Sequence, residues 1–202
     1  MTATPTGSLR EAQKALTRSR IIDAARTVFE KNGYAGASIG LITTEAAINR
    51  ATFYLHFPDK FAVFREVVAH DRLHTDEYWH ELNTALMTGT RESIAGWVLR
   101  LTHWARDNAG LMPSRHEAMA SEPEFAKDFQ PRYDRLAIEI SEYLQTIPVA
   151  ERDDAKIRVQ MLVVMLDQML FHVVVQQAWD GPPDQVLRVV TDICCKALDI
   201  KD

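Results

Sequence analysis

Residues 50–56 combine side chains that suit contacts to a nucleic acid. They hold an arginine, a threonine, a tyrosine and a histidine within one short segment. An arginine can donate to guanine O6 and N7 or to a phosphate, and hydroxyl, phenol and imidazole groups can contact phosphate oxygens and base edges. Arg50, Thr52, Tyr54 and His56 are therefore candidates for binding double-stranded DNA.

A pair of histidines offers a second kind of chemistry. His70 and His74 are four residues apart, with further acidic and histidine residues nearby at Asp71, Glu77 and His80. This spacing can bind zinc, but the glutamate that follows the first histidine of a metalloprotease helix is missing. We therefore expect solvated polar surface here and no metal site.

An all-α enzyme is the alternative interpretation of the polar groups in the second half of the chain. It would use His103, His116, Asp167 and His172. The sequence has no phosphate-binding glycine loop, nucleophile elbow or complete metal motif, so we expect neither catalysis nor a bound cofactor. The two cysteines, Cys194 and Cys195, are adjacent on an expected helix, and we expect them to pack as small apolar side chains.

The charge is divided unevenly along the 202 residues. The formal net charge is −5, but residues 1–60 carry eight basic and five acidic groups, and the remaining residues carry 15 basic and 23 acidic groups. A small basic module on an acidic body is the pattern of a nucleic-acid-binding domain attached to another domain. We place the boundary at residue 60, giving domains 1–60 and 61–202, with residues 1–16 as a flexible arm.

A helical period of 3.6 residues runs through almost the whole chain, and no strand-like alternation stands out. The pattern predicts an all-α protein of about nine helices. The first ends at Asn32-Gly33, a helix-end pair, and Ser38 and Asn49 can cap the next two. The expected helices cover 17–31, 38–45, 50–56, 58–86, 91–108, 116–120, 122–147 (bent at Pro131), 150–179 and 184–200.

The second and third expected helices fit a helix-turn-helix unit. Ile42, Ile48 and Phe53 are spaced to pack the two helices together, which leaves the polar residues of 50–56 on the outside. A helix presented in this way can enter the major groove of DNA, which is about 12 Å wide.

Residues Thr17–Val68, about a quarter of the chain, resemble the DNA-binding domain of the tetracycline-repressor (TetR-type) transcriptional regulators. The most specific part is TFYLHFPDK, Thr52–Lys60, which is similar to the family pattern T-hydrophobe-Y-x-H-F-x-x-K. Supporting matches lie at Ile21–Ala25, Phe29 and Gly33-Tyr34.

The resemblance assigns further roles to single residues. It implies phosphate contacts for Tyr54, His56 and Lys60, while Ser38 would cap a helix whose N-terminus faces the DNA backbone. The complete set expected at the DNA is Ser38, Arg50, Ala51, Thr52, Tyr54, His56 and Lys60.

Two positions depart from the family pattern. The family usually has glycine in the turn where this chain has Ala47, and alanine where it has Thr43. Turn glycines often serve a positive φ, which costs another residue roughly 1 kcal/mol. Either the turn has another shape here or the strain is tolerated.

Two apolar helices near the C-terminus predict a dimer. Residues 159–175 are apolar on nearly all sides, which indicates packing both inward and against a partner. The resemblance implies a four-helix interface built from the last two helices of each subunit. We assign to it Leu162, Leu166, Met169, Val173, Val186, Val190 and Ile193, although ordinary monomer core is the alternative for each.

Polar groups set among methionines and aromatic residues predict a ligand cavity in the acidic body. The candidates are Trp97, His103, Trp104, His116, Met119, Tyr143, Met161, Met165, Gln168 and His172. A well-filled core would produce the same helical stripes, so that alternative stays open.

These observations predict a dimeric DNA-binding regulator, most simply a repressor released from a pseudo-palindromic operator by an apolar or aromatic small molecule. A protein-interaction module with a vestigial DNA-binding segment is a further alternative. Salt-dependent binding to duplex DNA separates these classes. The run 159–175 looks too short and too polar to cross a membrane, and no leader segment follows Met1, so we expect a soluble cytoplasmic protein.

Overall fold

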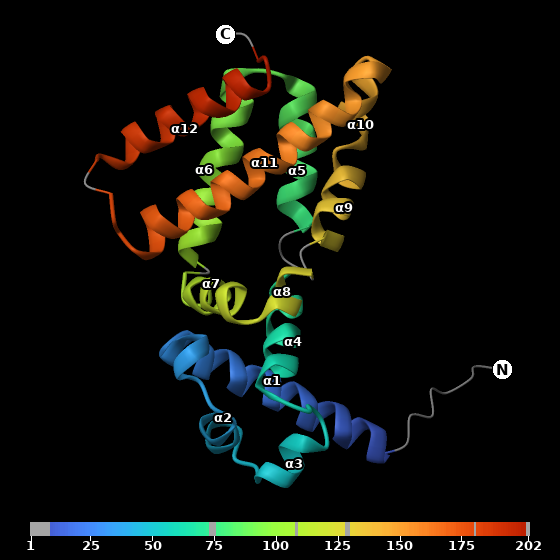
Figure 1. Ribbon diagram of the computed structural model, residues 1–202, viewed down its shortest axis with the longest axis vertical. Coiled ribbons are helices and arrows are strands. Elements are labelled where there is room, and N and C mark those ends of the chain that lie inside the picture. The colour runs from blue at the N-terminus through green and yellow to red at the C-terminus, as the bar shows by residue number, and fades with distance from the viewer. Residues whose placement is uncertain (1–8, 73–75, 108, 128–129, 180, 201–202) are drawn as a thin grey trace, which may run out of the picture.

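The computed structural model describes residues 9–72, 76–107, 109–127, 130–179 and 181–200. Every regular element in these ranges is helical, which confirms the expected all-α fold (Figure 1). The described ranges hold twelve α-helices rather than about nine. The difference arises mainly in the segment expected as one helix over 122–147, which is divided into three.

The helices follow one another with short connections. A 3-10 turn, Val149–Glu151, and a π-helical turn, Phe171–Val175, extend α11 at its two ends. The α-helices are α1 (Leu9–Gly36), α2 (Ile39–Glu45), α3 (Arg50–Tyr54), α4 (Lys60–Arg72), α5 (Asp76–Thr88), α6 (Arg91–Asp107), α7 (Met112–Ser121), α8 (Pro123–Lys127), α9 (Gln130–Glu139), α10 (Ser141–Thr146), α11 (Arg152–Leu170) and α12 (Pro183–Ala197).

The N-terminal core reaches beyond the boundary expected at residue 60. Helices α1 to α4 bury a cluster that includes Phe29, Phe53 and Phe64. Leu111 at the start of α7, Ala118 of α7 and Phe125 of α8 are buried in the same cluster. Helices α7 and α8 therefore complete the core of the N-terminal module.

A second core fills the C-terminal bundle. It is formed mainly by buried side chains of α5, α6, α11 and α12, with single contributions from the first residue of α7, from α9 and from the C-terminal end of α9. Ile94, Trp97 and Leu166 are among its largest buried members. In Figure 1, α11 crosses α5 and α6, and α12 closes one side of the bundle.

The backbone settles two expectations about the ends of helices. Gly33 has φ 71°, so α1 is kinked where the Asn32-Gly33 pair predicted a helix end. Residues 9–16, expected in a flexible arm, are the first turns of α1 instead, and that expectation is wrong for them. Residues 1–8 of the arm, and 73–75 within the expected helix 58–86, lie outside the described residues.

The apolar helix near the C-terminus is longer than the sequence suggested. Val149–Val175 forms one helical stretch of 27 residues, and a window of 18 residues within it has a mean hydropathy of 1.5, so the stretch meets the length and composition of a membrane crossing. The expectation that this run is too short is wrong. A core helix of a globular protein meets the same criterion, and one face of α11, including Val159, Val163 and Leu166, is buried in the C-terminal core.

Candidate nucleic-acid interface

The helices α2 and α3 are held by the two caps that the sequence predicted. The Ser38 hydroxyl accepts from the Leu41 amide at 3.3 Å, and the Asn49 carboxamide oxygen accepts from the Thr52 amide at 2.8 Å. Ile42 and Phe53 are fully buried, each at 0% exposure. The pair therefore packs as a helix-turn-helix unit.

The turn between α2 and α3 tolerates strain. Ala47 has φ 49°, in the left-handed region, which costs a non-glycine residue roughly 1–2 kcal/mol. The Ile48 amide donates to the Thr43 carbonyl at 3.0 Å, closing the turn around Ala47. Of the two alternatives left open by the sequence, the strained turn is the one observed.

The outer face of α3 carries most of the expected contact residues. Arg50, Ala51 and Tyr54 are exposed. The Tyr54 ring lies nearly perpendicular to the buried Phe53 ring, with the two ring centres 5.6 Å apart. The Thr52 hydroxyl is less available for a DNA contact, because it donates to the Asn49 carboxamide oxygen at 3.0 Å. The Arg50 guanidinium lies against the first turn of α2, where a Cβ added to Gly40 would be 3.3 Å from Nη2.

His56 is a neutral, partly buried group in this structure. Burial lowers its pKa, and the positive charges of Lys14 and Arg18 lower it further. At neutral pH the ring can therefore offer a phosphate a hydrogen bond but no charge.

Lys60 connects α4 to the end of α1. Its ammonium donates to the carbonyls of Tyr34 at 2.7 Å and Ala37 at 3.2 Å, and it lies 4.2 Å from the centre of the Tyr34 ring. A lysine there also complements the negative end of the α1 dipole. Two of its three donors are used within the domain, so the predicted phosphate contact has one donor left.

Three side chains from α7 and its C-terminal end form hydrogen bonds with α1 close to its kink. The Glu117 carboxylate accepts from the Ala35 amide at 2.8 Å, and Tyr34 donates to the Glu122 carboxylate at 2.6 Å. The buried Ser114 hydroxyl donates to the Phe29 carbonyl at 2.8 Å. Burial of Tyr34, together with the bond to Glu122, raises its pKa, so the phenol stays protonated.

The opposite side of α7 contacts the apolar helix of the C-terminal bundle. Arg115 pairs with Asp167 at 3.5 Å, and the His116 ring stacks on Phe171 at 3.7 Å. Burial lowers the pKa of His116, so the stacked ring is neutral at pH 7. Helix α7 thus touches both the N-terminal module and the π-helical end of α11.

Gly33→Ala should destabilise this junction, while Gly36→Ala should not. A Cβ at Gly33 would lie 2.8 Å from the Glu117 carboxylate on a backbone with positive φ, whereas the nearest atom to a Cβ at Gly36 is 3.6 Å away. We expect Gly33→Ala to cost about 1–3 kcal/mol, which chemical denaturation can measure. Equal stability of the two variants would show that neither the positive φ nor the approach of Glu117 constrains the kink.

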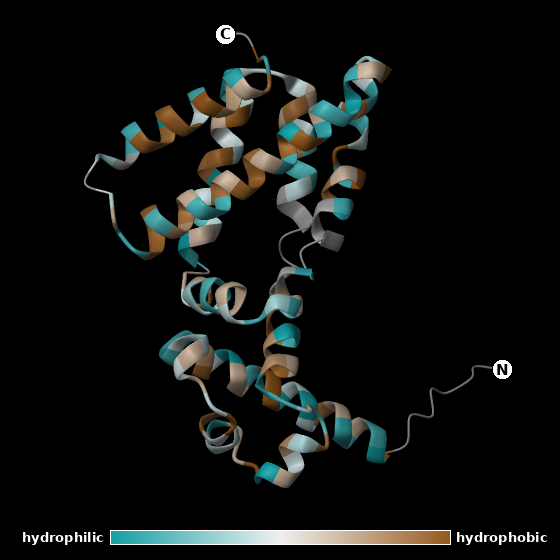
Figure 2. Cartoon of the chain, in the orientation of Figure 1, coloured by the Kyte–Doolittle hydropathy of each residue, from teal (hydrophilic) through white to brown (hydrophobic). Residues whose placement is uncertain are grey.

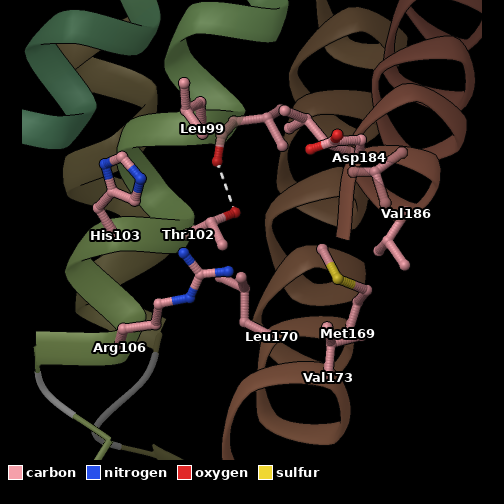
Figure 3. Close-up of a pocket in the computed structure, with 12 residues that line it drawn as sticks. Leu99, Thr102, His103, Arg106, Met169, Leu170, Val173, Asp184 and Val186 are labelled. Atoms are coloured by element: carbon pink, nitrogen blue, oxygen red, sulfur yellow. Dashed lines mark hydrogen bonds between the residues drawn. The ribbon is translucent and has the colours of Figure 1, made fainter. Parts of the chain in front are cut away.

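A cavity of about 240 Å³ lies between α6, the end of α11 and α12 (Figure 3). Its walls are apolar, with four polar side chains among them: Thr102, His103, Arg106 and Asp184. Thr102 donates to the Val98 carbonyl at 2.9 Å. Arg106 and Asp184 form no ion pair within the described part of the chain, so both charges remain available to a ligand.

The expected ligand residues do not converge on this cavity. His103 alone among them lines it. Trp97 is buried core, and Trp104, Tyr143 and Met165 pack against that core. His116 stacks on Phe171, and the others, Met119, Met161, Gln168 and His172, are exposed. Arg106 and Asp184 were missed because they lie on two helices far apart in sequence.

The expected dimer residues fall into two groups. Met169, Val173, Val186, Val190 and Ile193 line an apolar groove of about 720 Å³ between the end of α11 and α12, together with the exposed Trp179. Leu162 and Leu166, with exposures of 9% and 1%, belong to the core of the single chain instead. Val190 contributes to both, since it is 6% exposed and lines the groove.

The structure bears on the histidine pair and on the two cysteines that the sequence singled out. His70 is exposed, His74 lies outside the described residues, and no cluster of metal-binding side chains occurs in the part of the chain that is described. Cys194 and Cys195 are buried, as expected for packing, and burial raises the pKa of Cys194 to about 12.

Comparisons with known proteins centre on the N-terminal module. Residues 21–67 match the model of the bacterial regulatory proteins of the tetR family. The transcriptional regulator UidR of Escherichia coli is 39% identical over 56 residues, 28% of this chain and 29% of that protein. The chain therefore matches less than a third of the length of that relative.

Two further comparisons extend over the C-terminal bundle. The transcriptional repressor Rv1474c of Mycobacterium tuberculosis is 25% identical over 186 residues, 91% of this chain and 93% of that protein. A solved structure of a tetR-family regulator from Mesorhizobium loti has a TM-score of 0.65 at 20% identity, covering 92% of this chain and 96% of its own. That likeness shows a shared fold.

Proposed function

We propose that this chain is a transcriptional regulator of the tetR type, because residues 21–67 match that family's model and the relatives are regulators. It would bind operator DNA as a dimer and act as a repressor that a small molecule releases. The observation that carries the proposal is the capped pair α2–α3, which presents Arg50, Ala51 and Tyr54 outward. The relatives are regulators rather than enzymes, and they leave the enzyme alternative without support.

The groove between α11 and α12 supports a dimer. Apolar side chains remain exposed on both helices, among them Met161 at 65%, Val189 at 49% and Ile193 at 42%. Figure 2 shows hydrophobic residues, in brown, along both helices. Exposed apolar area of this kind marks an interaction surface. We take this partner to be a second copy of the chain. A dimer would place two copies of α3, the recognition helix, on two half-sites about 34–36 Å apart.

The cavity beside α6 supports regulation by a small molecule. Its volume of about 240 Å³ is slightly below the roughly 300–1,000 Å³ of most ligand sites, so it suits a compact molecule. Its wall includes Leu170 and Val173 on either side of Phe171, the residue that stacks on His116 of α7. A ligand that changes this wall would act on the helix that holds the α1 kink, and through it on the DNA-binding module.

DNA binding can be tested before the operator is known. Selection from a pool of random duplexes should enrich one two-fold symmetric site. Arg50→Ala should weaken binding to that site by about 1–3 kcal/mol and relax the preference at one or two base pairs. Lys31→Ala, which removes an exposed charge at the far end of α1, is the matched control.

The proposal fails if the wild-type protein enriches no site and shows no salt-dependent affinity for duplex DNA. A protein-interaction module would give that result. An unchanged base preference in Arg50→Ala would remove only Arg50 from the residues that read bases.

A further inference from the structure

The first turns of α1 form an extension of the DNA-binding module. The family match begins at residue 21, but α1 is helical from Leu9. Arg10, Lys14 and Arg18 follow one another at four-residue spacing, so they form one basic stripe along this helix.

Contacts of Arg18 show which way the stripe faces. Its guanidinium lies 4.8 Å from the centre of the Phe57 ring and pairs with Glu66 at 2.7 Å. Phe57 lies three residues after the end of α3, so the basic stripe faces the C-terminal end of α3. In Figure 1 the first turns of α1 reach the same end of the molecule as α3.

Lys14, one helical turn before Arg18, lies close enough to the end of α3 to affect a residue there. Lys14 and Arg18 both contribute to lowering the pKa of His56, a residue beside the end of α3. Glu66 compensates Arg18, whereas Arg10 and Lys14 are exposed and make no ion pair with a residue that the structure describes. Two uncompensated positive charges therefore stand next to the predicted DNA-contacting surface.

We infer that Arg10 and Lys14 bind the phosphate backbone of the DNA that flanks each half-site, so that α1 widens the protein–DNA contact beyond the helix-turn-helix unit. The inference rests on the proposed function. Residues four apart on a helix are about 6 Å apart along its axis, and the phosphates of one strand rise about 3.4 Å each along the axis of the duplex. Two charges of the stripe can therefore bind two different phosphates of one strand, without reading bases.

The test compares duplexes of two lengths. The site enriched by selection is prepared once ending at the half-sites and once with several additional base pairs on each side. Lys14→Gln and the double variant Arg10→Gln/Lys14→Gln are compared with Lys31→Gln, which removes an exposed lysine from the same helix. Glutamine is a good helix former, so the melting temperatures should be equal.

We expect both stripe variants to bind the long duplex more weakly than the wild type, for specific and random sequences alike, and to match the wild type on the short duplex. For each phosphate that a variant no longer binds, the wild-type advantage should shrink about 3.5-fold as salt rises from 50 to 200 mM. Lys31→Gln should behave as the wild type.

Three outcomes would overturn the inference. Stripe variants that match Lys31→Gln on the long duplex would show that α1 does not touch the DNA. A weakening confined to one flanking sequence would show base reading instead of phosphate binding. A wild-type protein without salt-dependent DNA binding would overturn the proposed function together with this extension of it, whereas normal wild-type binding with unaffected stripe variants would overturn the extension alone.

Discussion

Val189→Glu and Ile193→Glu should each convert the proposed dimer into folded monomers with greatly reduced affinity for the operator. Both side chains are exposed in the single chain, at 49% and 42%, and both line the groove between α11 and α12. A carboxylate at these positions is solvated in the monomer but unpaired in the dimer, which costs several kcal/mol per site. Sedimentation velocity and circular dichroism should show monomers of unchanged helicity.

Two control variants separate the interface from the rest of the molecule. Val149→Glu adds the same charge at a position that is 76% exposed and lies outside the groove, so it should remain dimeric. Leu166→Glu should unfold the chain, because Leu166 is 1% exposed within the C-terminal core. If Val189→Glu and Ile193→Glu stay dimeric, the subunits meet through another surface.

Phe125→Ala should lower the free energy of unfolding by about 3–5 kcal/mol. The ring is fully buried, with its centre 5.4 Å from that of Phe64 and 6.0 Å from that of Phe61, and it joins α8 to α4. Its removal leaves a cavity in the N-terminal core and loosens the packing between that core and the rest of the chain. Denaturant titration followed by circular dichroism measures the change in stability.

Met119→Ala is the matched comparison for this variant. Met119 lies one helix earlier, in α7, and is 42% exposed, so its truncation should cost much less. A destabilisation below about 1 kcal/mol for Phe125→Ala would show that α8 is not part of the N-terminal core, since a buried aromatic ring cannot be removed so cheaply.

The DNA-binding module could be predicted from the sequence because its determinants are local. The caps at Ser38 and Asn49 bond to amides three residues away, and the kink at Gly33 depends on its own φ. The exposed and buried faces of α3 follow from helical periodicity, which placed Phe53 inside and Arg50 outside. The sequence left open whether the turn tolerates strain at Ala47, and the backbone decided it.

The cavity, the groove and the limits of the core were decided by tertiary structure. A helical stripe shows that a residue faces other helices, but Leu166 and Ile193 have similar apolar patterns and differ only in what packs on them. Arg106 and Asp184 share a cavity wall because α6 and α12 pack together, and Phe125 fills the N-terminal core from a helix outside the first 60 residues. Periodicity records which face of one helix is apolar, whereas burial and cavities depend on how several helices pack, so no single segment of sequence contains that information.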